Sequence, residues 1–215
     1  TSRMAATLAH EIKNPIAGIR SGIQLLKGRA VKDGDKMLCD SMIHEIDRVT
    51  ALIMNLLTLS IRRESLKTEV SVTGVLKEIG MIYAKGPDSR RASRLVEAEE
   101  GLRASLNENE FRQIIHNLIS NSLKALVPDR EGQIKLMAAA QEKEVLVTVR
   151  DNGKGMTEEE VSKALEPFYT KSINGTGLGL SIVSRLVESN GGTMEIVSKP
   201  GVGTDVVLRF PGKMI

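Results

Sequence analysis

The sequence predicts an α+β protein with two domains, a helical hairpin over residues 1–62 and an α/β sandwich with a mixed sheet over residues 63–215. The first part has apolar residues at spacings of three and four and no strand signal, as amphipathic helices require. The second part alternates helical and strand patterns, and its last strands are joined by short connections. A length of 215 residues is more than one small core needs.

The composition is that of a globular protein and argues against several functions. Apolar residues make up 41% and charged residues 27% of the chain. A formal charge of +3 without clustered basic residues, together with 2% aromatic residues, argues against nucleic-acid binding. Cys39 is the only cysteine, so no internal disulfide forms, which fits a reducing, cytoplasmic compartment.

No membrane span or secretory signal is visible in the sequence. The first residues, Thr1 to Met4, resemble the interior of a longer chain. We therefore expect a fragment whose membrane anchor, if the parent protein has one, lies in segments outside it.

The first domain is predicted as two helices joined by a turn at residues 31–35, where Asp and Gly gather. Pro15 lies inside the first helix, removes one backbone hydrogen bond and should bend that helix. Further apolar residues lie beside the main apolar stripe, and two helices alone cannot bury all of this apolar surface. We therefore expect a homodimeric four-helix bundle. The main stripe consists of Leu8, Ile12, Ile16, Ile19, Ile23 and Leu26, continued by Cys39, Met42, Ile46, Val49, Ile53 and Leu56.

The second domain is expected to follow a linker at residues 61–68. The pattern predicts three longer helices and five strands, with a helix end before Pro128 and another at Gly191. The expected helices cover about 72–84, 108–126 and 178–190, and the expected strands cover 94–98, 133–139, 144–150, 193–198 and 204–210.

His10 lies on the opposite side of its helix from the apolar stripe, so its ring should face solvent. A plain surface histidine is the alternative interpretation. Three neighbours favour a reactive one. Glu11 can orient the ring by accepting a hydrogen bond, Asn14 lies one turn further on the same face, and Pro15 bends the helix beside them.

The helix at 108–126 has a polar stripe beside its apolar one. Asn is a weak helix former, so Asn117 and Asn121, four residues apart, suggest a purpose other than a solvated face. Their side-chain oxygens suit Mg²⁺ together with substrate phosphates. Lys124 could then reach a phosphate as a point charge.

Two glycine-rich segments follow. Asp151 ends an apolar strand, and its carboxylate could accept a hydrogen bond from the amino group of adenine. Gly153 and Gly155 would let the backbone come close to such a ligand. A plain turn is the alternative there. The second segment opens a helix, where backbone N–H groups and the helix dipole favour phosphate. It contains Gly175, Thr176, Gly177, Leu178 and Gly179.

These segments resemble the sequence boxes of sensor histidine kinases, in the family's order. Residues 8–15 are similar to the phosphoacceptor box. Residues 117–125, 151–156, 166–171 and 174–180 are similar to the N, G1, F and G2 boxes. Ser122 replaces the alanine that usually follows the second Asn, a change that we expect to be neutral.

The resemblance covers nearly the whole chain and implies the ATP-binding fold shared with gyrase, heat-shock chaperone and mismatch-repair ATPases. It implies that His10 accepts the γ-phosphoryl group of ATP, that Glu11 assists proton transfer, and that Asn14 positions water for phosphate removal. It further implies Mg²⁺ at Asn117 and Asn121, the base at Asp151, and Phe168 packed against a mobile lid. The phosphoryl group would pass to an aspartate of a response regulator.

Several alternatives stay open at this stage. A conformational ATPase of the same fold would use a Glu where Asn117 stands, and a nucleotide-sensing scaffold would not need His10 and Glu11. A kinase in which phosphatase activity dominates remains compatible with Asn14. The segment between Phe168 and Gly175 is short for a lid, and Lys171 within it could contact phosphate but is more simply a solvated lysine. Asp205 is interpreted as structural.

Overall fold

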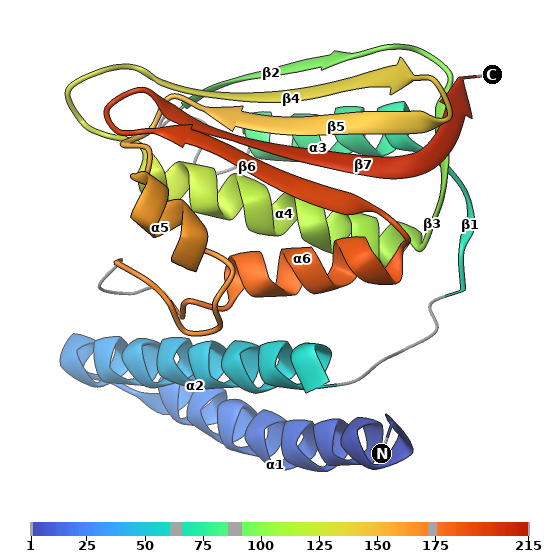
Figure 1. Cartoon of the computed structure of the whole chain (residues 1–215). Coiled ribbons are helices and arrows are strands. Elements are labelled where there is room, and N and C mark those ends of the chain that lie inside the picture. Colours follow the sequence, from blue (N-terminus) through green and yellow to red (C-terminus); the bar gives the residue numbers. More distant parts are fainter. Residues whose placement is uncertain (1, 61–65, 86–91, 172–175, 215) are drawn as a thin grey trace. The chain divides into compact units, whose positions relative to one another are not determined.

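The computed structural model describes residues 2–60, 66–85, 92–171 and 176–214. Within the described helices and strands, side chains are described except at residues 2–11, 13, 51, 54–60, 92, 94 and 214. The chain divides into two compact units, Thr1–Arg63 and Glu64–Ile215. Each unit is considered by itself below (Figure 1).

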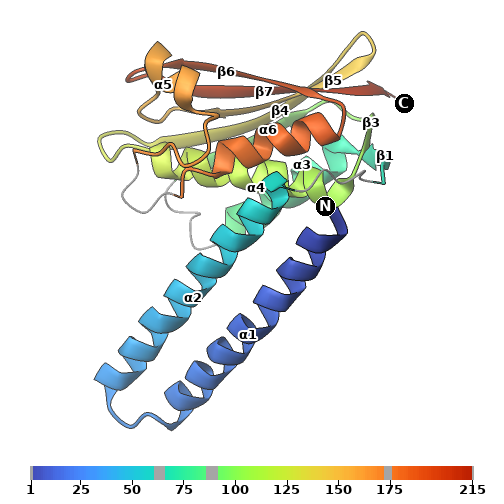
Figure 2. The ribbon, with the colours of Figure 1, turned by 60° about the horizontal axis from the view of Figure 1, so that its bottom comes forward.

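The first unit is an antiparallel pair of helices, α1 (Ser2–Arg29) and α2 (Asp33–Ser60), seen side by side in Figure 2. Helix α1 continues through Pro15. Two ion pairs join the helices, Arg20 to Asp47 at 2.8 Å and Lys27 to Asp40 at 2.5 Å. Among the described residues, no helix is long and apolar enough to cross a membrane.

The turn of the hairpin is shorter than predicted. Helix α2 begins at Asp33, inside the range expected to form the turn, and Asp33 and Asp35 occupy its first turn. Acidic side chains are favourable there because they face the positive end of the helix dipole. The residues that suggested a turn therefore serve as a helix start.

The second unit is a seven-stranded mixed sheet with helices on one face. The strand order is β1-β3-β7-β5-β4-β2, and β6 pairs with β7. All pairs are antiparallel except β2 with β4. The predicted helical region followed by an α/β layer with a mixed sheet is confirmed. The strands are β1 (Thr68–Ser71), β2 (Ala92–Ala98), β3 (Leu102–Leu106), β4 (Gly132–Gln141), β5 (Glu144–Asp151), β6 (Thr193–Lys199) and β7 (Gly203–Met214), and the helices are α3 (Val72–Lys85), α4 (Glu108–Ala125), α5 (Glu158–Lys163) and α6 (Gly179–Ser189).

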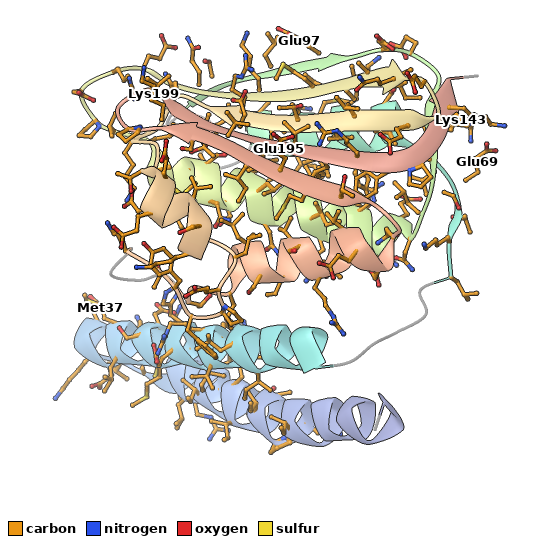
Figure 3. The ribbon with its side chains drawn as sticks, in the orientation of Figure 1. Met37, Glu69, Glu97, Lys143, Glu195 and Lys199 are labelled. Carbon is orange, nitrogen blue, oxygen red and sulfur yellow. The ribbon has the colours of Figure 1, made fainter. Side chains whose placement is uncertain are left out.

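The core lies between the sheet and helices α3, α4 and α6, which cover one face in Figure 1. Phe111 of α4 and Phe210 of β7 are fully buried and meet edge to face with ring centroids 5.8 Å apart. The other face of the sheet carries charged pairs. Figure 3 labels two of their members, Glu97, which pairs with Lys135, and Glu195, which pairs with Arg209.

Asn190 fixes α6 relative to α4. Its side chain is 1% exposed, and its Oδ1 accepts from the backbone N–H of Asn107 at 2.7 Å. Its Nδ2 donates to Glu110 Oε2 at 2.8 Å. Asn107 in turn caps α4, because its side chain accepts from the N–H of Glu110. The two helices that carry the candidate site residues are thus held together at the end away from that site.

Three short elements were not predicted. Strand β1 begins at Thr68, inside the expected linker, and Val70 is its only buried residue, so no alternation could reveal it. Strand β3 does alternate between buried and more exposed residues, but over five residues only. Helix α5 has a capping box between Thr157 and Glu160, a readable signal that the sequence interpretation left unused.

Candidate nucleotide site and phosphoacceptor histidine

Helix α4 presents the two candidate asparagines on its polar side. Its apolar residues are buried against the sheet, so Asn117 and Asn121 are held half-buried at the margin of the core. Lys124 of the same helix is exposed. The buried Nδ2 of Asn117 is the one buried side-chain polar atom without a hydrogen-bond partner among the described residues.

The second asparagine touches the start of α6. A Cβ added to Gly179 would lie 3.3 Å from both terminal atoms of the Asn121 amide. Glycine therefore lets the first residue of α6 approach the amide more closely than other residues allow. The structure thus brings together the segments that resemble the N box and the G2 box, which lie far apart in the sequence.

The N-terminus of α6 has no side-chain cap, unlike α4 and α5. Its first backbone N–H groups therefore keep their capacity to bind an anion. Thr176 accepts a long hydrogen bond of 3.4 Å from the N–H of Leu178. Leu178 is fully buried and belongs to the core. Gly175 lies outside the described residues.

Asp151 is a buried acid at the end of β5. The residue is 8% exposed. Its Oδ1 accepts a hydrogen bond from the N–H of Gly153 at 2.8 Å, and its Oδ2 accepts one from the hydroxyl of Ser122 at 3.0 Å. Burial raises the pKa of Asp151, and these hydrogen bonds oppose that rise. The carboxylate is thus held by groups that favour its ionised form.

The loop after Asp151 is packed tightly enough to require glycine. A Cβ at Gly153 would lie 2.6 Å from the carbonyl oxygen of Ala125, and Gly155 has a φ of +67°. Arg130, which the sequence analysis did not single out, donates to the carbonyl of Gly153 at 2.6 Å and to that of Gly201 at 2.8 Å. The loop is therefore fixed on two sides.

Phe168 adopts a left-handed backbone conformation with φ of 70°, rare for a residue other than glycine. Its N–H donates to the carbonyl of Gly177 at 2.9 Å, and a Cβ on Gly177 would collide with the Phe168 backbone. The side chain is 60% exposed. The F-box and G2-box segments are therefore joined through their backbones.

Lys171 is an exposed lysine that forms a surface ion pair. Its Nζ lies 2.6 Å from Glu160 Oε1, and this contact, together with hydrogen bonds from Thr157, lowers the pKa of Glu160 to about 2. Glu160 is also the capping-box residue of α5. The Lys171 side chain is 63% exposed, so it lies in solvent as expected, and the ion pair with Glu160 is a contact that the sequence did not predict. Residues 172–174 of the expected lid lie outside the described residues.

His10, Glu11 and Asn14 all lie in helix α1. The side chains of His10 and Glu11 lie outside the described residues, so the predicted exposure of the ring stays a prediction. Asn14 is exposed. Asp205 forms a two-bond ion pair with Arg150 on the sheet.

The candidate cation ligands in this unit are the side-chain amides of Asn117 and Asn121. Among the described residues, no group of three or more His, Cys, Asp or Glu side chains could hold a metal ion. The two asparagine amides on α4 are hard oxygen donors of the kind that Mg²⁺ takes alongside phosphates. The unsatisfied amide of Asn117 fits such a group, because a half-turn of the amide presents its oxygen in place of its nitrogen.

Comparisons with known families agree with this geometry. The family model described as histidine kinase-, DNA gyrase B- and HSP90-like ATPase matches residues 106–214, more than half of the chain. The model of the His Kinase A (phospho-acceptor) domain matches residues 1–65. This chain belongs to the sensor histidine kinases. The predicted family is thereby confirmed.

Curated relatives of this histidine kinase core include sporulation kinase B of Bacillus subtilis (strain 168), which is 28% identical over 99% of this chain and 50% of its own length. The sensory histidine kinase/phosphatase NtrB of Azospirillum brasilense is 32% identical over 92% of this chain and 52% of its own length. The sensor histidine kinase ZraS of Klebsiella oxytoca is 33% identical over 97% and 45%. The chain thus spans about half the length of these relatives.

Solved structures show the same fold. Full-length ShkA in complex with AMPPNP superposes with a TM-score of 0.85 at 23% identity, over 100% of this chain and 47% of ShkA. The catalytic domain of the histidine kinase ThkA, in a nucleotide-free form, has a TM-score of 0.60 at 25% identity, over 67% of this chain and 95% of that domain.

The buried Asp151 makes a prediction about stability. Because burial raises its pKa in the folded state, its contribution is fully favourable at low pH and is lost as pH rises through the folded pKa. Asp151→Asn keeps an acceptor for Gly153 and gains a donor for Ser122. In the absence of nucleotide, the variant should unfold at a higher temperature than the parent at about pH 7, by a margin that shrinks toward about pH 4.

Thermal unfolding followed by circular dichroism at several pH values measures this margin. Asp129→Asn, which neutralises an exposed carboxylate, is the matched control and should show no such trend. If Asp151→Asn were less stable than the parent at neutral pH, burial of the ionised carboxylate would not be what lowers the stability of the parent.

Proposed function

We propose that the chain binds ATP in its second unit and transfers the γ-phosphoryl group to His10. The observation that carries the proposal is the contact between Asn121 of α4 and Gly179 of α6, which joins a pair of amide ligands to an uncapped helix N-terminus. The match of residues 1–65 to a phospho-acceptor domain supports His10 as the acceptor.

In this proposal the base binds at Asp151, whose carboxylate accepts a hydrogen bond from the amino group of adenine. The phosphates lie at the N-terminus of α6, where Thr176, Gly177 and Gly179 and the dipole stabilise negative charge. Asn117 and Asn121 would hold Mg²⁺, which supplies neutralisation of phosphate charge when bound. Lys124 is exposed and provides a further positive charge on the same helix.

The chemistry is an in-line displacement. A ring nitrogen of His10 forms a bond to the γ-phosphorus, the bond from that phosphorus to the β–γ bridging oxygen breaks, and ADP leaves. Glu11 holds the ring and receives the proton from it. Positioning and charge stabilisation carry most of such a transfer, because little covalent chemistry is left to the protein.

Two further activities follow from the same residues. The phosphoryl group on His10 would pass to an aspartate of a response regulator. Asn14, which is exposed one turn beyond His10, would orient water for removal of phosphate from that regulator. The name of the related NtrB, a sensory histidine kinase/phosphatase, supports this second activity. A cytoplasmic location suits both.

Labelling with γ-labelled ATP and Mg²⁺ tests the acceptor. The parent chain should gain acid-labile, base-stable label, and His10→Ala should lose it completely, because phosphoramidate chemistry needs the imidazole. His44→Ala removes an exposed histidine from α2 and should keep the label. Label that persists in His10→Ala would remove His10 from the proposal.

We also propose that the hairpin forms a homodimeric four-helix bundle. None of its described side chains is buried. Ile19 and Leu26 of α1 are seven residues apart and 58% and 62% exposed, and Met42 and Val49 of α2 repeat this spacing at 45% and 38%. Exposed apolar stripes at heptad spacing are typical of helices that pack against a second copy.

Leu26→Lys tests the dimer. A lysine in the apolar stripe would be desolvated on association, so the dissociation constant should rise by roughly tenfold or more. Gln24→Lys adds the same charge to an exposed position on another side of α1 and should have little effect. Sedimentation equilibrium measures both. A parent chain that is monomeric at micromolar concentration would contradict the dimer.

A further inference from the structure

Ser122 lies directly against the acid that the proposed function assigns to the base of ATP. It is 5% exposed, and its hydroxyl donates to Asp151 Oδ2 at 3.0 Å. The sequence analysis expected this replacement of the family's usual alanine to be neutral. An alanine could not make the contact, so the serine gives this chain a hydrogen bond that the usual residue lacks.

The hydroxyl fixes one carboxylate oxygen while the loop fixes the other. The N–H of Gly153 binds Oδ1 at 2.8 Å, and Gly153 is itself immobilised by Ala125 and by Arg130. Donors from three segments therefore fix the carboxylate of Asp151: the Ser122 hydroxyl of α4, the Gly153 N–H of the loop after β5, and the Thr204 backbone of β7. Ser122 is the one side chain among the described residues that donates to Oδ2.

The chemistry of this pair is selective. A hydroxyl has one proton, and that of Ser122 is used by Asp151, so its oxygen has only lone pairs left. An ionised carboxylate also has only lone pairs. The pair therefore offers acceptors and no donor to a base. A purine with a 6-amino group donates to them, whereas a purine with a 6-oxo group presents a carbonyl oxygen at that position, and two acceptors facing each other are costly in a buried site.

We propose that Ser122 is a positioning residue of the nucleotide site, whose hydroxyl holds Asp151 in the orientation that accepts a 6-amino purine and so strengthens discrimination against a 6-oxo purine. This inference rests on the proposed binding of ATP at Asp151. The serine acts through the carboxylate and needs no bond of its own to the nucleotide.

The protonation of Asp151 supports this role. Burial raises the pKa of Asp151, the neighbouring charge of Asp205 on β7 raises it further, and the hydrogen bonds from Gly153, Ser122 and the Thr204 backbone lower it. A protonated carboxyl would present a donor and lose its preference for an amino group. Loss of the Ser122 hydroxyl should therefore extend the protonated form to higher pH.

Equilibrium binding of ATP and inosine 5′-triphosphate over about pH 5 to 8 tests the proposal, because this range spans the expected titration. For Ser122→Ala, the dissociation constant for ATP should rise about tenfold or more, the loss of one hydrogen bond to a charged group. The constant for inosine 5′-triphosphate should change much less. The ratio of the constant for inosine 5′-triphosphate to that for ATP, which measures the discrimination, should therefore fall. The pH at which ATP binding is half lost should move upward.

Three matched variants separate the possible causes. Ser122→Thr keeps the hydroxyl and should retain the parental ratio, whereas Ser122→Val, of similar shape, should behave as Ser122→Ala. This pair carries the test if the alanine variant is unstable. Thr73→Val removes a buried hydroxyl that bonds to the Glu99 carbonyl, far along the chain from Asp151, and should change thermal stability but not the ratio.

The outcomes distinguish this inference from the function on which it rests. Unchanged ratio and unchanged pH midpoint in Ser122→Ala and Ser122→Val would overturn the role of Ser122 while leaving ATP binding intact. If Asp151→Asn bound ATP as tightly as the parent, the assignment of the base to Asp151 would itself be wrong.

Discussion

The second unit of this histidine kinase core is organised around one buried carboxylate, that of Asp151, at the edge of the core. A buried charge is unfavourable unless donors surround it, and the chain supplies them from the loop after β5 and from α4. Because these donors come from separate elements, α4 must lie at a fixed distance from the end of β5. The register of β5 with β7, which pairs Asp151 with Thr204, holds the strand in the same place.

The remainder of the candidate site follows from that constraint. The loop at Gly153 can pass the end of α4 only without a side chain, and Gly155 passes the turn between β6 and β7 in a left-handed conformation. Once α4 is fixed, Asn121 meets Gly179 and sets where α6 begins. The uncapped start of α6, and the Nδ2 of Asn117 one helical turn before Asn121, are then groups that the fold leaves without partners. A phosphate with its cation satisfies both kinds of group.

The sequence predicted the order of the main elements because their apolar periods are long and regular. Helix α4 and strands β4 and β5 were predicted to within three residues at each end. Short elements were missed because four to six residues carry too little pattern. Contacts between distant segments could not be predicted either. Nothing in the spacing of Ser122 and Asp151, or of Lys171 and Glu160, reveals that each pair is in contact. The one available signal was that Ser122 departs from the usual alanine.

In the proposed function the second unit binds an adenine nucleotide and the first carries the phosphoryl acceptor. Both depend on recognition of the base by the buried carboxylate of Asp151. A crystal structure of the chain with a non-hydrolysable ATP analogue and Mg²⁺ tests this recognition. The 6-amino nitrogen should lie within about 3 Å of a carboxylate oxygen of Asp151, with the phosphates at the start of α6. A nucleotide bound with its base away from Asp151 would contradict it.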